Sequence, residues 1–242
     1  MTGINAKPAA HSERTVIGVD FGTLSARAVV VDAATGTVLG TAVSLFEHGV
    51  IDQTLPGTDE RLPPDWALQV PRDYVDSMVA AARGALADAQ IDPSTVIGIG
   101  TDFTACTVLP TTADGTPLCE LAEFAGRPHA YVKLWKHHAA QSHADRLNGI
   151  AHDRGEPWIG RYGGRLSSEW ELAKALQVSE EDPQVYARMD RWVEAADWIV
   201  WQGCCRWIRS RLSPNGPRCI TTGKHAIWSR APLLASYPDR QR

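Results

Sequence analysis

The part of this sequence that most constrains its fold is a pair of apolar runs near the N-terminus, separated by a short polar turn. Residues 16–19 and 28–31 are apolar apart from one glycine, and the polar turn between them starts at Asp20. Two β-branched runs on either side of a tight turn predict two antiparallel strands joined as a hairpin. A second turn at 35–36 and a third run at 37–46 extend the prediction to a three-stranded meander.

The first turn has the chemistry of a phosphate and metal site. Asp20 places a carboxylate at the end of a strand, Gly22 allows backbone N–H groups to approach a ligand, and Thr23 and Ser25 add hydroxyls. These groups suit a phosphate and its Mg²⁺, with Asp20 as the metal ligand. The alternative is an ordinary hairpin in which Asp20 and Gly22 serve only the turn. The spacing matches neither the P-loop nor the GxGxxG pattern.

The rest of the N-terminal half alternates predicted helix and strand. Apolar residues at helical spacing predict a helix from about residue 71 to Gln90, after an extended loop over 47–71. Residues 96–100 are typical of a short buried strand, and the turn at 114–115 predicts a hairpin-like return. Three strands, a helix and a further strand are typical of an α/β domain.

The second half is predicted to be mostly helical. Residues 128–152 are expected to form one long helix, and Ser168 with Glu171 matches a capping box that opens another. Asp182, followed by a proline, opens a third, and 194–202 forms a Trp-rich fourth.

Composition excludes several classes of protein. The chain has 242 residues and a net charge of −4, which gives no electrostatic footprint for nucleic acid or an anionic membrane. No apolar run is long enough to span a bilayer. Residues 1–14 lack the apolar core of a signal peptide and are expected to form a disordered tail. Five cysteines without a paired spacing indicate reduced thiols, hence a cytoplasmic protein.

Five blocks in order resemble one family, the FGGY carbohydrate kinases, in their ribulokinase branch. The blocks are 18–23, 100–107, 130–141, 162–170 and 194–202. The resemblance covers 15–202 continuously, and five weak motifs in the right order make a chance match very improbable.

The resemblance implies a ribonuclease H-like N-terminal domain of the sugar kinase, Hsp70 and actin superfamily, one half of an enzyme that closes over ATP and a ketopentose. The implied reaction is transfer of a phosphoryl group from MgATP to ribulose, as in the conversion of L-ribulose to L-ribulose 5-phosphate in arabinose catabolism. ATP and Mg²⁺ are the implied cofactors. The hairpin of Asp20, Gly22, Thr23 and Ser25 would hold the phosphates and Mg²⁺.

The resemblance also implies residues that border the sugar. Thr104 and Ala105 match the block that lines the sugar in this family, and Trp135 offers an aromatic face for stacking. Trp135 as a core residue, and Asp102 as a turn cap, are the alternatives. Lys136, His137 and His138 are expected to be a solvated helix face, and the histidines are not expected to form a metal cluster.

Residues 203–242 depart from the family pattern. This stretch is rich in Arg, Cys and Trp without a clear period, as in a frameshifted end or a variable insertion. The family's sugar-contacting lysine falls at His225, with Lys224 one place earlier, and adjacent strand residues face opposite sides. We expect residues 203–217 to be irregular.

Length leaves several hypotheses open. The resemblance implies that the catalytic base and the adenosine pocket lie in a C-terminal domain beyond Arg242. We therefore expect an N-terminal half with little activity alone, which works with a separate C-terminal half or as a homo-oligomer. A non-catalytic sugar-binding or regulatory module is the alternative, and an Hsp70-like or actin-like ATPase fits the blocks poorly. L-ribulose, D-ribulose and ribitol are not distinguished.

Overall fold

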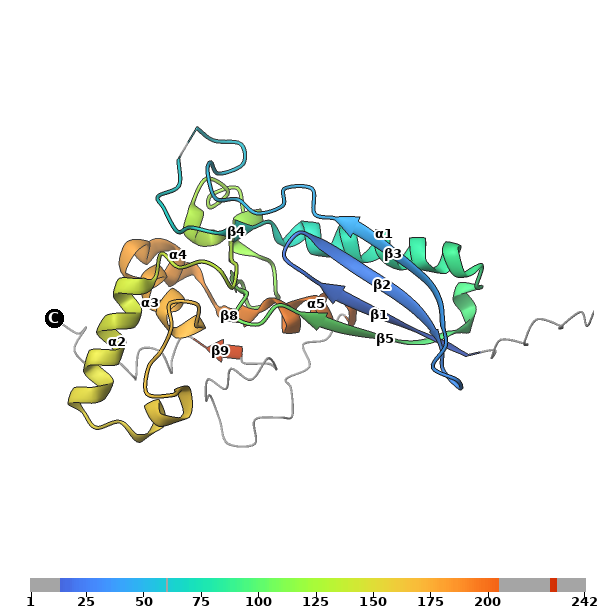
Figure 1. Cartoon of the computed structure of the whole chain (residues 1–242). Helices are drawn as coiled ribbons and strands as arrows, with labels where there is room; N and C mark the ends of the chain where they lie inside the picture. The colour runs from blue at the N-terminus through green and yellow to red at the C-terminus, as the bar shows by residue number, and fades with distance from the viewer. Residues whose placement is uncertain (1–13, 60, 205–226, 230–242) are drawn as a thin grey trace, which may run out of the picture. The chain divides into compact units, whose positions relative to one another are not determined.

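The computed structural model describes residues 14–59, 61–204 and 227–229. It has the predicted mixed α/β character, and its helices and strands are distributed over two compact units (Figure 1). The first unit contains residues up to Leu45 together with Asp76–Asp102, and the second contains Phe46–Val75 and the chain from Phe103 onward.

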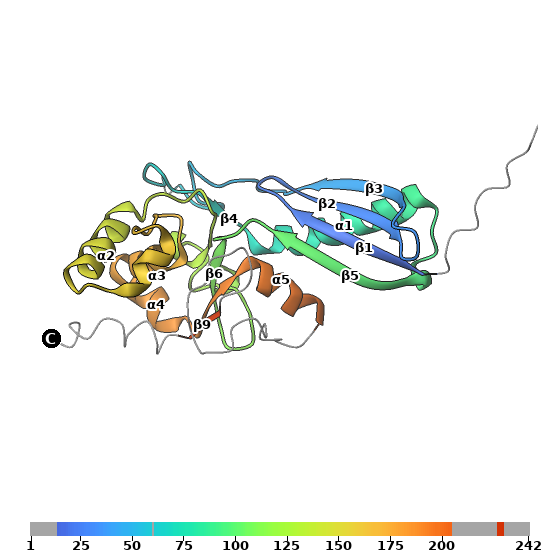
Figure 2. The same ribbon diagram turned by 60° about the horizontal axis from the view of Figure 1, so that its bottom comes forward.

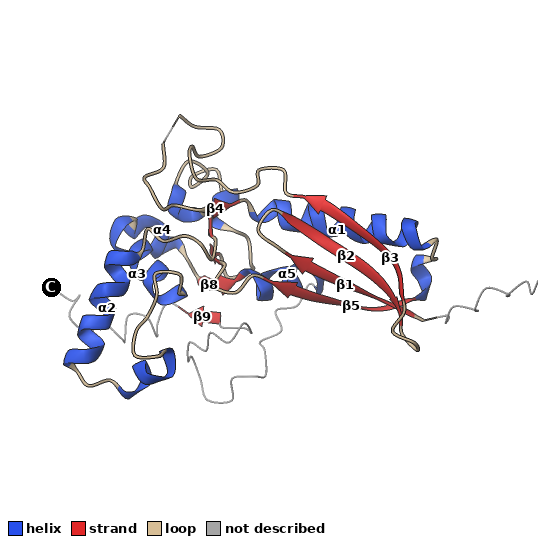
Figure 3. Ribbon diagram, in the orientation of Figure 1, coloured by secondary structure: helices blue, strands red, loops and turns tan. Residues whose placement is uncertain are grey.

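The first unit is a four-stranded sheet with the order β3-β2-β1-β5. The strands are β1 (Thr15–Phe21), β2 (Ser25–Asp32), β3 (Val38–Leu45) and β5 (Val96–Phe103). The first three form the predicted antiparallel meander, with Asp20 opposite Arg27. The arrows of β1 and β5 point the same way (Figure 3). Parallel neighbours need a crossover connection, and a helix lies between β3 and β5 in the chain.

The helix α1 (Pro71–Ala89) packs on one face of this sheet and confirms the predicted helix. The residues on that face alternate along β1 and β2, and the buried ones are Ile17, Val19, Phe21, Ala26, Ala28 and Val30. The closest approach is at Gly40, where an added Cβ would lie 2.5 Å from the Ala89 nitrogen. Only glycine fits there, because its missing side chain lets the backbone of β3 approach the end of α1 closely.

The prediction that 96–100 is a buried strand was wrong about burial. The strand forms, preceded by the 3₁₀ turn η1 (Pro93–Thr95), but Ile97 is 52% exposed and Ile99 is 60% exposed. β5 lies at an edge of the sheet, and the described residues leave at least half of each of these side chains exposed. Apolar sequence therefore identified the strand but not its surroundings.

The second unit contains a five-stranded sheet with the order β4-β7-β6-β8-β9. The strands are β4 (Leu68–Gln69), β6 (Val108–Thr111), β7 (Val132–Lys133), β8 (Arg191–Glu194) and β9 (Ile227–Ser229). The α-helices are α2 (Gln141–Asp153), α3 (Glu171–Glu181), α4 (Pro183–Arg188) and α5 (Ala195–Cys204). Of these, α2, α3 and α4 lie together to one side of the sheet (Figure 2). The 3₁₀ helices are η2 (Leu118–Glu120), η3 (Pro128–Ala130) and η4 (Pro157–Tyr162).

The predicted long helix over 128–152 was wrong in its first half. Residues 128–130 form η3, Val132 and Lys133 form β7, and α2 begins only at Gln141. Between them, the backbone bonds to a distant segment, since the Leu134 N–H donates to the Ala67 carbonyl and the His138 N–H to the Asp65 carbonyl. Long-range strand pairing has here overridden a local helical pattern.

The predicted capping box was also wrong. Glu171 is the first residue of α3, Trp170 is the N-cap without a side-chain cap, and the Glu171 side chain is buried. The neighbouring prediction is confirmed, because the Asp182 side chain caps α4 by accepting a hydrogen bond from the Val185 N–H at 3.0 Å. The helix predicted at 194–202 is confirmed as α5.

Several predictions lie outside the described residues. These are the tail over 1–13, Lys224 and His225, and most of 203–217. Within the described part of the chain, no helix has both the length and the apolar character needed to cross a membrane.

Candidate functional site

The β1–β2 hairpin brings the four predicted phosphate and metal residues into one turn. The Asp20 carboxylate accepts a hydrogen bond from Arg27 at 3.1 Å, and both side chains are about half exposed or more. The Gly22 N–H donates to the Ser25 carbonyl at 3.0 Å, so this amide closes the turn. Ser25 is 5% exposed, whereas Asp20 keeps an accessible oxygen.

The loop after β5 carries Thr104 and Ala105, and it is tightly held within the second unit. The hydroxyls of Thr104 and Thr107 lie 2.9 Å apart, and the Thr107 carbonyl accepts a hydrogen bond from the Ala195 N–H at 2.7 Å. Cys106 has a φ of 60°, a left-handed conformation that is uncommon for a residue with a side chain. Such backbone strain persists only where the surrounding structure enforces it.

Trp135 follows β7 at the start of a turn that the His137 N–H closes by donating to the Leu134 carbonyl at 2.9 Å. Its side chain is 36% exposed, so the alternative that it is a core residue was wrong. An accessible indole fits the predicted stacking role, although the turn, not a helix, presents it.

Sequence reasoning missed Lys174, which connects these two segments. Its ammonium donates to the Cys106 carbonyl at 2.7 Å and to the Leu134 carbonyl at 2.7 Å. Burial lowers the pKa of Lys174 to about 8, against the opposing effect of nearby acidic groups. Its position between Ala173 and Ala175 was the only signal, since small neighbours allow a helix to pack closely.

Carboxylates accompany this lysine. Glu171 lies one turn before it on α3, and Glu194 ends β8. Burial, and then the charge of Glu171, raises the pKa of Glu194 well above its usual range, while a hydrogen bond from the Cys106 backbone N–H opposes this shift. Glu171 and Glu194 therefore lie in the same buried surroundings as the Lys174 ammonium, which holds the Cys106 carbonyl.

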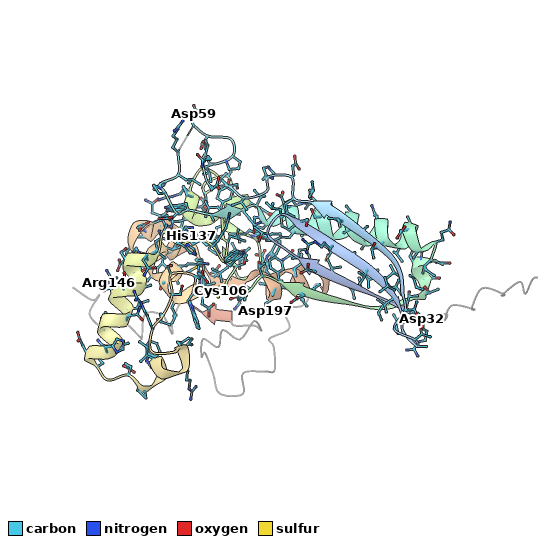
Figure 4. All side chains as sticks on the ribbon, in the orientation of Figure 1. Asp32, Asp59, Cys106, His137, Arg146 and Asp197 are labelled. Carbon is cyan, nitrogen blue, oxygen red and sulfur yellow. The ribbon has the colours of Figure 1, made fainter. Side chains whose placement is uncertain are left out.

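The prediction that His137 is solvated was wrong, while His138 is exposed as expected. His137 Nδ1 accepts a hydrogen bond from the Ala67 N–H at 3.2 Å, and its Nε2 lies 2.9 Å from Gln177 Oε1. Burial lowers its pKa well below the usual range, so the ring is neutral near pH 7. Figure 4 labels His137 and Cys106.

Lys133 is the second buried lysine of this unit, and its ammonium donates no hydrogen bond to any described residue. Its ammonium lies 4.4 Å from the centre of the Trp66 ring, and burial lowers its pKa to about 7. Nearby, His129 Nε2 lies 3.2 Å from Glu181, and burial lowers the His129 pKa to about 2.

Among the described residues, one group has the spacing of a metal site. Glu47, His48 and Asp73 offer ligand atoms within 4.8 Å of one another. Both Asp73 oxygens, however, accept bonds from His48, one from its ring and one from its backbone N–H, each at 2.9 Å. These two bonds anchor the start of α1 to His48.

Comparison with known proteins finds close relatives of this chain. A ribulokinase from Mycolicibacterium smegmatis is 61% identical over 206 residues, which make up 85% of this chain and 36% of that protein. The chain is homologous to the ribulokinases. Another ribulokinase, from Bacillus licheniformis, is 48% identical over 216 residues, 89% of this chain and 37% of that protein. The homologue described here thus spans about a third of the length of the curated ribulokinases it matches.

Solved structures show the same fold. A xylulose kinase from Rhodospirillum rubrum superposes with a TM-score of 0.58 at 19% identity, over 78% of this chain and 33% of that one. A gluconate kinase from Lactobacillus acidophilus gives a TM-score of 0.58 at 15% identity, over 78% of this chain and 33% of that one. The ribulokinase homologue therefore has the predicted sugar-kinase fold. No model of a protein family matches it.

Proposed function

We propose that this chain forms part of an ATP-dependent ribulokinase, in which it supplies the phosphate hairpin and part of the ketose-binding surface. The observation that carries the proposal is the 61% identity to a ribulokinase over 85% of the chain. Residues 15–202 would form the N-terminal kinase domain that this chain contributes to the enzyme. Cytoplasmic ATP, Mg²⁺ and ribulose are the ligands that this role requires.

The hairpin suits Mg²⁺ and phosphate. Asp20 offers a hard oxygen ligand at the surface, and its partner Arg27 is itself exposed. An exposed ion pair contributes little free energy, so a hydrated cation can replace Arg27 beside the carboxylate. Bound Mg²⁺ would neutralise phosphate charge during phosphoryl transfer. Thr23 and Ser25 would add hydroxyls to the same turn, with Gly22 shaping it.

The sugar surface would be built on Thr104, Ala105 and Trp135. The loop that carries Thr104 and Ala105 is pinned by hydrogen bonds from the Ala195 N–H and from Lys174. Trp135 adds an exposed ring. Apolar faces combined with a few fixed polar groups are what polyol recognition requires.

A coupled assay that measures ADP formation tests the proposal. The chain would be supplied with the remaining two thirds of a homologous ribulokinase and MgATP, against L-ribulose, D-ribulose, ribitol, xylulose and glycerol. We expect turnover with a ribulose and little with glycerol, and no turnover by the chain alone, because positioning and proton acceptance would then be incomplete.

Two matched variants locate the metal role. Asp20→Asn should reduce turnover at least about a hundredfold, because a neutral amide replaces the oxygen ligand. Asp145→Asn is the control, since Asp145 forms an equally exposed pair with Arg165 at 2.8 Å. Ribulose binding without turnover in any mixture would favour the non-catalytic sugar-binding module instead.

A further inference from the structure

Lys174 links two segments that are far apart in the sequence. Cys106 directly follows the Thr104–Ala105 pair, and Leu134 directly precedes Trp135. The Lys174 ammonium lies 2.7 Å from each of the carbonyl oxygens of Cys106 and Leu134. One buried cation therefore sets the distance between two backbone segments.

The link lies in a buried part of the second unit. The Lys174 side chain is fully buried on α3, with Glu171 one turn away on the same helix. Lys174 holds the carbonyl of Cys106, a residue in a left-handed conformation that persists only where its surroundings enforce it.

We propose that Lys174 is a positioning residue of the ketose site, which fixes the loop of Thr104 and Ala105 relative to Trp135. The inference rests on the proposed function, and it assigns to Lys174 no contact with the sugar. Hydrogen bonds from a charged donor in a dry interior are strong, so the two segments behave as one wall. Displacement of a binding wall by about 1 Å is enough to impair a site.

Lys133 provides a matched control. It is a second lysine with a fully buried side chain in the same unit, but its ammonium serves no acceptor among the described residues. Replacing either lysine by methionine removes one buried cation at similar volume. Only Lys174→Met removes a link between the two segments.

The experiment combines two measurements on the whole chain. Hydrogen exchange in the free protein reports on segments 104–107 and 134–137. Saturation-transfer NMR with L-ribulose reports binding. We expect Lys174→Met to speed exchange in both segments together and to weaken ribulose binding at least about tenfold. Lys133→Met should change neither. Should Lys174→Met fail to fold, Lys174→Gln keeps a donor too short to span both carbonyls, and the same two changes are expected.

The outcomes separate the two hypotheses. Unchanged exchange in both segments of a folded Lys174 variant would overturn the positioning role while the unaltered chain still bound ribulose. Faster exchange with unchanged affinity would overturn it too. No ribulose binding by the unaltered chain, either alone or with the remaining two thirds of a homologous ribulokinase, would overturn the proposed function, and with it the ketose site that the inference needs.

Discussion

The two units of this chain bury different kinds of groups. In the first unit the sheet and α1 share an apolar face, and the buried carboxylate of Asp32 accepts bonds from backbone N–H groups of its own turn at 2.9 Å. The second unit buries both Lys133 and Lys174 among carboxylates and imidazoles. The second unit also has an apolar core, which includes Leu68, Val108 and Leu118. Both units thus bury apolar area, but only the second adds buried lysines that depend on specific polar partners.

The difference extends to the surface. The first unit leaves apolar strand residues exposed on β3 and β5, including Val43 at 63% and Leu45 at 75%. The second unit instead carries the exposed Trp135 beside a turn fixed by a buried lysine. The sheet of the first unit forms although one of its faces leaves apolar side chains exposed. A buried polar network forms only when tertiary structure brings its donors and acceptors into contact.

The largest loss of stability is expected from a substitution that disrupts the close approach of helix and sheet in the first unit. Gly40→Val places a side chain against the backbone of α1, where even a Cβ would lie 2.5 Å from the Ala89 nitrogen and 2.6 Å from the Ala85 oxygen. Such overpacking should lower the free energy of unfolding by about 3 kcal/mol, measured by urea denaturation. Gly98→Val is the control, since nothing lies within 4 Å of its added Cβ. Equal losses in both variants would contradict this account.

An intermediate effect is expected in the pH dependence of the second unit. Because the pKa of Lys133 falls to about 7 on folding, the unfolded chain binds more protons above that pH. Stability should therefore rise with pH between about 7 and 10 through this group, by about 2 kcal/mol from pH 7 to 9. Lys133→Met should remove that rise, so the variant gains most over the unaltered chain near pH 7 or below. A difference in urea midpoint between the unaltered chain and Lys133→Met that does not change with pH would contradict this prediction.

The smallest effect is expected at the surface of the first unit. Arg27→Ala removes the partner of Asp20, but both side chains are about half exposed or more. The free energy of unfolding should change by less than about 0.5 kcal/mol, measured by thermal denaturation. Arg127→Ala is the contrast from the second unit, because Arg127 pairs at 2.7 Å with Asp182, whose side chain is 6% exposed. A larger loss from Arg27→Ala than from Arg127→Ala would reverse the comparison.

Predictions from the sequence succeeded where structure depends on local neighbours and failed where distant contacts decide it. The meander, α1 and the Asp182 cap were predicted because each depends on neighbours within a few residues. The long helix over 128–152 and the capping box were wrong because β7 pairs with distant strands and Glu171 is drawn into a buried polar cluster. Those competing contacts cannot be seen in a local pattern.

By itself, the sequence determined the class of fold, the order of elements in the first unit and the relationship to ribulokinases. Periodicity and motif order are properties of the chain, and they survive without coordinates. Only the tertiary structure decided that Lys174 bonds to the carbonyls of Cys106 and Leu134, residues that lie 68 and 40 positions away. The physical reason is that a lysine is recognisable as buried only once the carbonyls that compensate for its lost hydration have been brought to it.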